Sequence, residues 1–98
     1  MKRILFESYI CNNLSRNVYQ HFWFQKMDQA LEKAAKDISL IQEFGEDFGD
    51  GDKFDGLIIV ENGIVVFEIF SNKEIDTINS EYSEKFQKFF EKAQKQIL

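Results

Sequence analysis

Apolar and polar residues alternate over the first residues of the chain. Their two-residue period predicts a strand over Lys2–Ile10. One side of this strand carries Ile4, Phe6 and Ile10, and the other carries Leu5, Glu7 and Tyr9. Asn12 and Asn13 then interrupt the apolar pattern, so we expect the strand to end before them.

After the two asparagines, apolar residues recur at the spacing of a helix. Asn13 or Ser15 can cap a helix through a side-chain oxygen, and the apolar residues beyond them predict a helix from about Arg16 to Lys36. The expected buried stripe is Val18, Phe22, Met27, Ala30, Leu31, Ala34 and Ala35. The expected polar face is His21, Gln25, Asp28 and Glu32.

Two further elements are predicted by apolar runs of different length. Ile38–Phe44 is short and predicts a second strand. Near the carboxyl end, Ser80 can cap a helix over Glu81–Ile97. The apolar stripe of this helix is Tyr82, Phe86, Phe89, Phe90, Ala93 and Ile97.

A hairpin is predicted in the most apolar part of the chain. Leu57–Val60 and Ile64–Phe70 flank Asn62-Gly63, a dipeptide that tolerates the positive φ angles of a two-residue type I′ turn. With this turn Val60 opposes Val65, Ile58 opposes Phe67 and Asp55 opposes Phe70. One face of the hairpin is then wholly apolar and the other is acidic only towards its ends, so helices are expected to cover the sheet.

The predicted order of elements is therefore β-α-β-β-β-α. This order is typical of a single α+β domain, or a small α/β domain, covering residues 1–98. We expect a small mixed sheet around the hairpin at Asn62-Gly63, with two amphipathic helices packed on it.

Charge is concentrated in one segment. Glu43–Asp55 holds six acidic residues and one lysine, a net charge of −5 that equals the formal net charge of the whole chain. The remaining residues hold equal numbers of acids and bases. An acidic chain with interleaved bases is not expected to bind nucleic acid directly, because phosphate contacts need clustered Lys and Arg.

Several classes of protein are excluded by the absence of their motifs. The one cysteine, Cys11, cannot form an internal disulfide, no apolar run approaches the ~20 residues of a membrane span, and no signal-peptide pattern is present. The sequence has no Walker loop, GxGxxG, CxxC or HExxH motif, so we expect no cofactor. A cytoplasmic single-domain protein is predicted.

The acidic segment has three interpretations. Its run DGDKFDG is similar to a calcium-binding loop, but the third acid and the glycine come one position too late for an EF-hand, so no metal site is predicted. The segment could be a solvated loop. As a partner-binding site, it would use the charges of Glu46, Asp47, Asp50 and Asp52, with Phe48 or Phe54 as an apolar anchor.

A second pair of acids permits an enzymatic alternative. In FDGLIIVENGIVVFEIF, the hairpin register places Asp55 and Glu68 on one face. This arrangement and the order of elements resemble the PD-(D/E)xK nuclease core, in which two acids hold a divalent metal and a lysine polarises the attacking water. Phe70 occupies the position of that lysine. The resemblance implies a degenerate relative, or a nuclease with another base such as Lys73.

Aromatic residues suggest a third site. Tyr19, Phe22, Trp23 and Phe24 span more of the predicted helix than one buried stripe requires. Either the helix is buried on a broad face, or Trp23 or Phe24 helps to form a dimer or partner interface. The only histidine, His21, has no evident partner for a general-base role, and Cys11 has no basic neighbour.

The favoured interpretation is a non-enzymatic acidic binding protein. Its size, charge and lack of catalytic motifs resemble the small immunity and antitoxin-type inhibitors of bacterial toxin systems. This resemblance implies a basic protein partner, namely a cognate toxin such as a nuclease, whose active surface the chain would occlude. A structural or self-associating subunit is the remaining alternative.

Overall fold

The computed structural model describes residues 3–13, 15–49, 51–70, 75–77 and 80–97, and these ranges contain two helices and six strands. In chain order the elements are β1 (Ile4–Cys11), β2 (Arg16–Phe24), α1 (Met27–Phe44), β3 (Asp47–Gly49), β4 (Asp52–Glu61), β5 (Ile64–Phe70), β6 (Ile75–Thr77) and α2 (Ser80–Ile97).

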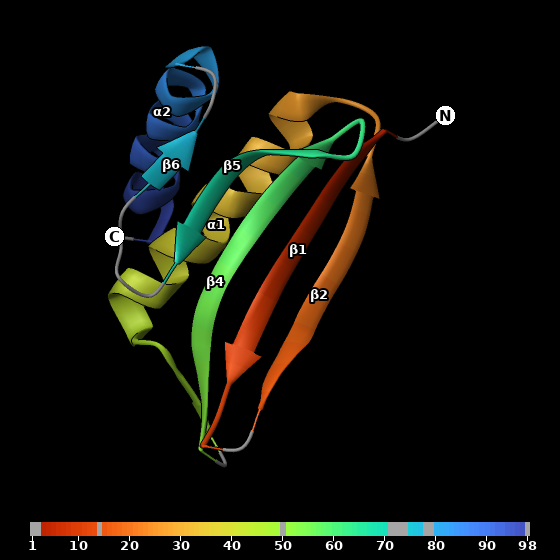
Figure 1. The fold of residues 1–98 in the computed structure, drawn as a ribbon. Helices are drawn as coiled ribbons and strands as arrows, with labels where there is room; N and C mark the ends of the chain where they lie inside the picture. The colour runs from red at the N-terminus through yellow and green to blue at the C-terminus, as the bar shows by residue number, and fades with distance from the viewer. Residues whose placement is uncertain (1–2, 14, 50, 71–74, 78–79, 98) are drawn as a thin grey trace.

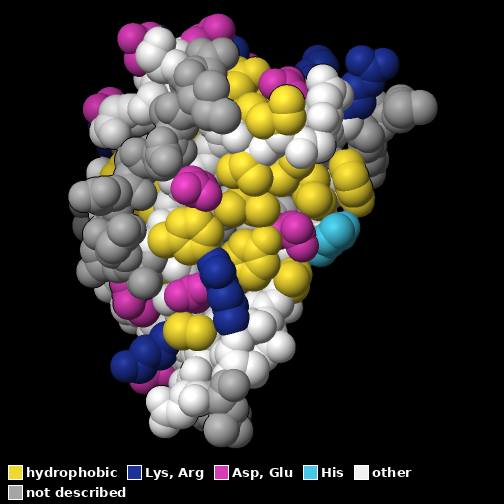
Figure 2. All heavy atoms as spheres, viewed as in Figure 1, with side chains coloured by type: hydrophobic (Ala, Val, Ile, Leu, Met, Phe, Trp, Pro, Cys, Tyr) yellow, Lys and Arg dark blue, Asp and Glu magenta, His cyan; other side chains and the backbone are white. Residues whose placement is uncertain are grey.

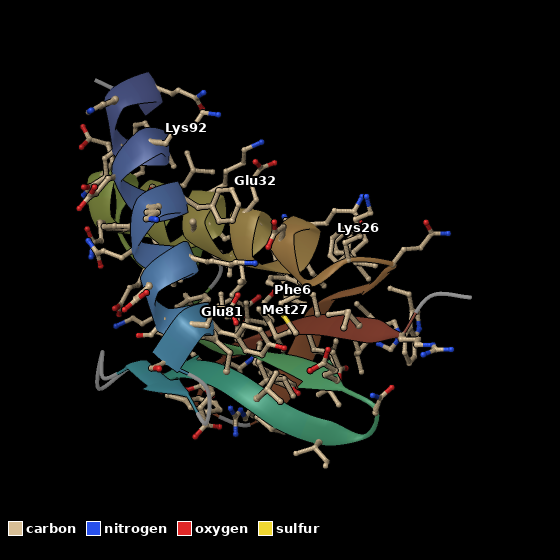
Figure 3. All side chains as sticks on the ribbon, turned by 90° about the horizontal axis from the view of Figure 1, so that it is seen from above. Phe6, Lys26, Met27, Glu32, Glu81 and Lys92 are labelled. Atoms are coloured by element: carbon tan, nitrogen blue, oxygen red, sulfur yellow. The ribbon has the colours of Figure 1, made fainter. Side chains whose placement is uncertain are left out.

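The strands form one curved sheet, with both helices on the same face (Figures 1 and 3). The strand order is β2-β1-β4-β5-β6, and β3 pairs with the beginning of β4. The α+β class and the two helices are confirmed. The expectation of a mixed sheet was wrong, since every strand pair in the described residues is antiparallel. Short connections allow only antiparallel pairing in β1–β2, β3–β4 and β4–β5, whereas β1 and β4 are brought together by the longer connection through β2, α1 and β3.

The first half of the predicted helix is a strand. Arg16–Phe24 forms β2 and pairs with β1 from Cys11 back to Ile4. The prediction failed because aromatic and β-branched residues dominate this segment, and such residues favour a pleated surface. Over a few residues, aromatic side chains at helical spacing can also be accommodated by a strand that contains one bulge. In β2 this bulge lies opposite Ser8 and Tyr9 of β1.

The helix begins later and ends later than predicted. At its start, the backbone N–H of Lys26 donates a hydrogen bond to Oε1 of Gln29, 3.2 Å away. The helix then continues through Ile38–Phe44, where a strand was expected, because the buried stripe of Leu31, Ala34 and Ala35 continues with Ile38. It stops at Gly45, whose N–H donates to the carbonyl oxygen of Ile41 at 2.7 Å.

The predicted hairpin is confirmed, but its register changes along the strands. Asn62 and Gly63 have φ angles of 53° and 82°, as a type I′ turn requires, and Val60 opposes Val65. A bulge then shifts the pairing by one residue, so Phe67 opposes Ile59 and not Ile58. A one-residue shift exchanges the faces of one strand relative to its partner. As a result Leu57 and Ile59 share the buried side of the sheet with Phe67, and Ile58 points away from the helices.

The core lies between the sheet and the two helices. Phe6 of β1, Phe67 of β5 and Phe86 of α2 are almost completely buried, and the rings of Phe67 and Phe86 have centroids 5.0 Å apart. The predicted helix at Glu81–Ile97 is confirmed, with Ser80 as its first residue. Leu31 of α1 is also fully buried, so both helices contribute to one core.

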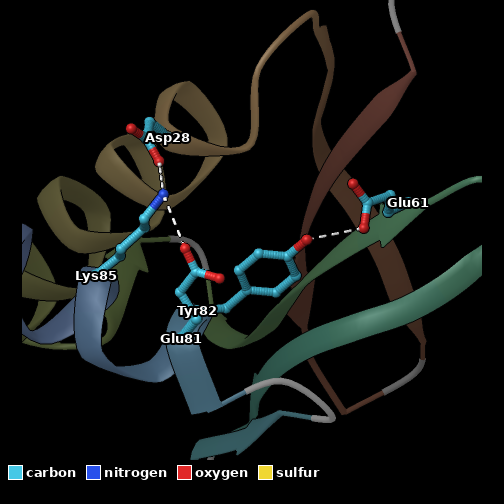
Figure 4. Close-up of polar contacts among 5 residues, drawn as sticks. All are labelled: Asp28, Glu61, Glu81, Tyr82 and Lys85. Atoms are coloured by element: carbon cyan, nitrogen blue, oxygen red, sulfur yellow. Dashed lines mark hydrogen bonds and ion pairs between the residues drawn. The ribbon is translucent and has the colours of Figure 1, made fainter.

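Polar contacts join α2 to the rest of the domain (Figure 4). The hydroxyl of Tyr82 donates a hydrogen bond to Oε1 of Glu61 in β4, 2.9 Å away. Nζ of Lys85 lies 3.0 Å from the Asp28 carboxylate of α1 and 3.6 Å from that of Glu81. Burial, and then the hydrogen bond to Glu61, raises the pKa of the Tyr82 phenol above its ordinary 10.0.

Replacing Tyr82 by Phe should lower the free energy of unfolding by about 1 kcal/mol at pH 8, because the hydrogen bond to Glu61 is lost. Tyr82 keeps its proton in the folded state at a pH where the unfolded state loses it. Its contribution is therefore complete below pH 10 and decreases as the pH rises above that value. Urea titrations of both proteins at pH 8 and above pH 10 should give a difference that shrinks at the higher pH.

Tyr19→Phe is the matched control, since the Tyr19 side chain is 52% exposed. It should change stability by less than about 0.5 kcal/mol at both pH values. A Tyr82→Phe protein as stable as the wild type at pH 8 would contradict the role of this hydrogen bond.

Candidate functional site

The most extensive candidate site is the face of the sheet that the helices leave uncovered. Cross-strand partners point to the same side of a sheet, so the observed register places the side chains of this uncovered face in three rows. We call them the open face: Trp23, Leu5, Val60 and Val65; His21, Glu7, Ile58 and Glu68; and Val18, Tyr9, Gly56 and Phe70. Figure 2 shows this side of the molecule, where apolar side chains form a band interrupted by a few charged ones.

Exposure confirms that no other part of the described chain covers the open face. Trp23 is 47% exposed and Val18 is 52% exposed. The side chains on the opposite side of the same strands, such as Ile4, Phe6 and Ile59, are buried. The uncovered side of the sheet is thus mainly apolar, whereas an antiparallel sheet usually presents polar residues to water.

Arg16 organises one end of the open face. Its guanidinium carbon lies 4.6 Å from the ring centroid of Tyr9 and 4.8 Å from that of Phe70, and its Nε forms an ion pair with the carboxylate of Asp55. The Phe70 ring lies against Gly56, which has no side chain in the way. This arrangement holds a cation and two rings together at the surface.

Glu7 lies near the centre of the open face. Its Oε2 is 3.3 Å from Nδ1 of His21, so His21 has a carboxylate neighbour that the sequence did not reveal. The expected position of His21 on a polar helix face was wrong, because it lies on β2. Burial, and then the charge of Glu7, raises the pKa of the Tyr9 phenol.

The predicted partner-binding residues of the acidic segment divide into surface and core. Asp47 and Phe48 are exposed on β3, and Asp52 is half-buried, where it accepts a hydrogen bond from Nδ2 of Asn12 at 3.1 Å. Glu46 is also half-buried. Phe54 is only 6% exposed and belongs to the core, so it is not available as an anchor.

Asp50, the remaining predicted residue of this set, lies outside the described residues, as does Lys73. The residues that remain at the surface lie at the end of the sheet where β4 begins, beside the connection between β1 and β2 (Figure 1). They therefore adjoin the end of the open face that carries Arg16 and Asp55.

The two acids of the nuclease-like alternative do not have the expected register. Glu68 opposes Ile58 and not Leu57, and Asp55 is paired with Arg16. Within the described ranges, no group of three or more His, Cys, Asp or Glu side chains could hold a metal ion. The two residues predicted to mediate self-association also separate, since Trp23 lies on the open face and Phe24 packs against the core.

Comparison with protein-family models, with curated proteins and with solved structures finds no match for this chain. Neither described helix has the length and apolar character that a membrane span requires. The interpretation of the site therefore depends on its own geometry.

Gly56 offers a test of the geometry at the Arg16 end of the open face. A Cβ at this position would lie 2.7 Å from the carbonyl oxygen of Ile69 and even closer to the Phe70 ring. We expect Gly56→Ala to lower the free energy of unfolding by about 1–3 kcal/mol through overpacking, as measured by urea denaturation.

Lys53→Ala, an exposed change on the same strand, should alter stability by less than about 0.5 kcal/mol. If Gly56→Ala were as stable as this control, the close approach of Phe70 to β4 would be refuted.

Proposed function

We propose that this chain is a non-enzymatic binding protein that docks a basic partner protein on the open face of its sheet. The observation that carries this proposal is the apolar and aromatic open face, with Val18, Trp23 and Val65 exposed and the others half-buried, which nothing in the described chain covers. Contiguous apolar patches on soluble proteins commonly mark sites of protein interaction.

The composition of the open face supports a protein partner. Tyr9, Trp23 and Phe70 supply large rings, and Arg16 supplies a cation held in place by two of these rings. Aromatic residues and arginine are enriched at interfaces and provide much of their binding energy. Because Arg16 is already oriented by Tyr9, Phe70 and Asp55, less side-chain entropy is lost when a partner binds.

Charge favours a basic partner over a second copy of this chain. The open face contains Glu7 and Glu68, the acidic segment adjoins it, and the whole chain carries a net charge of −5. Two copies would repel each other, whereas a cationic protein would be attracted and steered towards this end of the sheet.

A finer proposal concerns the class of partner. A small acidic protein with one broad binding face is suited to stoichiometric inhibition, in which the face occludes the active surface of a basic toxin such as a nuclease. On this proposal the chain is a bacterial immunity-type protein that acts in the cytoplasm.

The first test concerns the open face. It uses a basic protein that co-purifies with this chain from the native host, and it measures binding between the two purified proteins. Ile58→Lys places a positive charge between Glu7 and Glu68, so the monomer should tolerate it. The same charge should repel a basic partner and weaken binding at least about tenfold in calorimetry. Trp23→Ser should weaken binding by a similar factor through loss of an apolar anchor.

Gln87→Lys on the exposed surface of α2 adds the same charge away from the open face and should leave the affinity unchanged. Equal affinities for Ile58→Lys and Gln87→Lys would exclude the open face as the docking surface. A homodimer that Trp23→Ser dissociates, seen by light scattering, would replace the partner protein by a second copy.

The acidic segment should affect the rate of association more than the rate of dissociation. Asp47→Asn combined with Asp52→Asn should slow association severalfold at low salt and reduce its dependence on ionic strength, as measured by stopped-flow mixing. The matched control removes two charges from α2 with Glu84→Gln and Glu91→Gln, and it should have a smaller effect. If both double variants associate equally fast, the acidic segment does not steer the partner.

A further inference from the structure

A separate cavity lies on the helix-covered side of the sheet, between the edge strand β2, the adjacent β1 and the second half of α1. Its volume is about 320 Å³, which falls within the range of small-ligand sites. Phe44 at its rim is 74% exposed and Leu40 is 46% exposed, so the cavity opens to solvent. The residues that matter for its chemistry are Ser8, Tyr19, Gln20, Asp37, Asp47 and Phe48.

Two buried polar atoms in this cavity have no hydrogen-bond partner among the described residues. They are Oγ of Ser8 and Oε1 of Gln20, which belong to directly opposed residues of β1 and β2. Ser8 is only 3% exposed and occupies the side of β1 that otherwise buries Ile4 and Phe6. An unsatisfied buried polar atom is costly. Both atoms are closed off from solvent, so a ligand in the cavity would contact them only after the two side chains turn towards it.

Two carboxylates, which when ionised only accept hydrogen bonds, line the cavity together with Tyr19. Asp37 is half-buried, and Asp47 lies at the rim. Burial raises the pKa of the Asp37 carboxyl, and the hydrogen bond from Nζ of Lys33 at 2.9 Å opposes this shift. Lys33 itself faces the rings of Phe6 and Phe22 and does not line the cavity. No lysine or arginine of the described residues lines it, so the charged groups of its lining, Asp37 and Asp47, are both acidic.

Aromatic rings form the walls around these acceptors. The rings of Tyr19 and Phe48 have centroids 5.1 Å apart, and Phe44 and Phe54 complete the apolar lining. Ring faces attract cations, and the attraction increases where water is excluded. The combination of acceptors and rings fits a ligand with several N–H donors, a positive charge and an apolar body.

We propose that this cavity binds an organic cation, namely a primary ammonium or a guanidinium group on a short apolar chain or ring. On binding, the Ser8 and Gln20 side chains would turn so that Ser8 Oγ and Gln20 Oε1 accept hydrogen bonds from the N–H donors of the cation, and the apolar part would lie against Tyr19 and Phe48. The cation could belong to a free amine or to a lysine or arginine side chain of a protein. This inference does not depend on the docking of a partner on the open face.

The first experiment compares matched probes by NMR titration of the folded chain. Phenethylammonium and the neutral isostere 2-phenylethanol have the same apolar body, so their difference reports the cationic group. We expect phenethylammonium to bind at least about tenfold more tightly, with shifts at the amides of Ser8, Gln20 and Gly45, and 3-phenylpropionate to bind more weakly than either. Equal binding of amine and alcohol, or no binding by either, would overturn the proposal.

Two variants locate the binding to the two buried acceptors. Ser8→Ala removes a buried hydroxyl for which the described residues offer no hydrogen-bond partner, so it should leave thermal stability unchanged or raise it. The same variant should weaken phenethylammonium binding severalfold. Gln20→Leu removes the facing acceptor at similar size and should weaken binding in the same way. Glu91→Gln on the exposed surface of α2 is the control and should bind as the wild type does.

If Ser8→Ala and Gln20→Leu both bound phenethylammonium as tightly as Glu91→Gln does, the proposed site would be wrong. Blocked Gly-Lys-Gly and Gly-Arg-Gly tripeptides distinguish the sources of the cation. Binding of these peptides in the cavity assigns it to a protein side chain, and binding of agmatine without the peptides assigns it to a free amine. Trp23→Ser should leave probe binding unchanged, so failure of the open-face proposal and failure of this one are separable.

Discussion

Two helices lie side by side on one face of a six-stranded sheet, and this one-sided packing determines most of the surface chemistry of the protein. Phe6, Phe67, Phe86 and Leu31 bring both helices onto the same side, where they form a single core. The opposite side then has no covering element among the described residues. An antiparallel sheet tolerates this if its outer face is polar. Here the outer face is rich in aromatic and aliphatic residues, which pack with one another across the strands but are not covered by a second layer. The proposed docking of a partner would remove these residues from water.

Local signals in the sequence predicted the elements that depend on local chemistry. Asn62-Gly63 specifies its own turn through the positive φ angles of both residues, and the amphipathic spacing of Glu81–Ile97 specifies α2. Arg16–Phe24 could not be assigned in the same way, because its rings fit either period and only pairing with β1 decides between them. The register of β4 and β5 was also beyond the sequence, since a bulge that improves packing of Leu57 and Ile59 is set by the core and not by the turn.

The candidate sites also divide into features that the local sequence reveals and features that depend on tertiary packing. The charge of the acidic segment was visible from composition, and Asp47 and Phe48 do lie at the surface. The cluster around Arg16 was not visible, because its members come from four strands and Arg16 was assigned to a helix. One signal for the cavity was present but was not interpreted. Ser8 follows Ile4 and Phe6 at the same two-residue spacing, so a polar residue occupies a position that the pattern marks as buried.

β1 connects the two proposed sites because it contributes alternate residues to each. Leu5, Glu7 and Tyr9 point to the open face, whereas Ser8 points to the cavity beside α1. This strand is paired on both sides, with β2 and β4, so its backbone is held firmly and the two sets of side chains keep fixed relative positions. A ligand in the cavity would contact β2 through Gln20, next to His21 of the open face. Any coupling between the two proposed sites would therefore run through β2, in which Gln20 belongs to the cavity and the adjacent His21 to the open face.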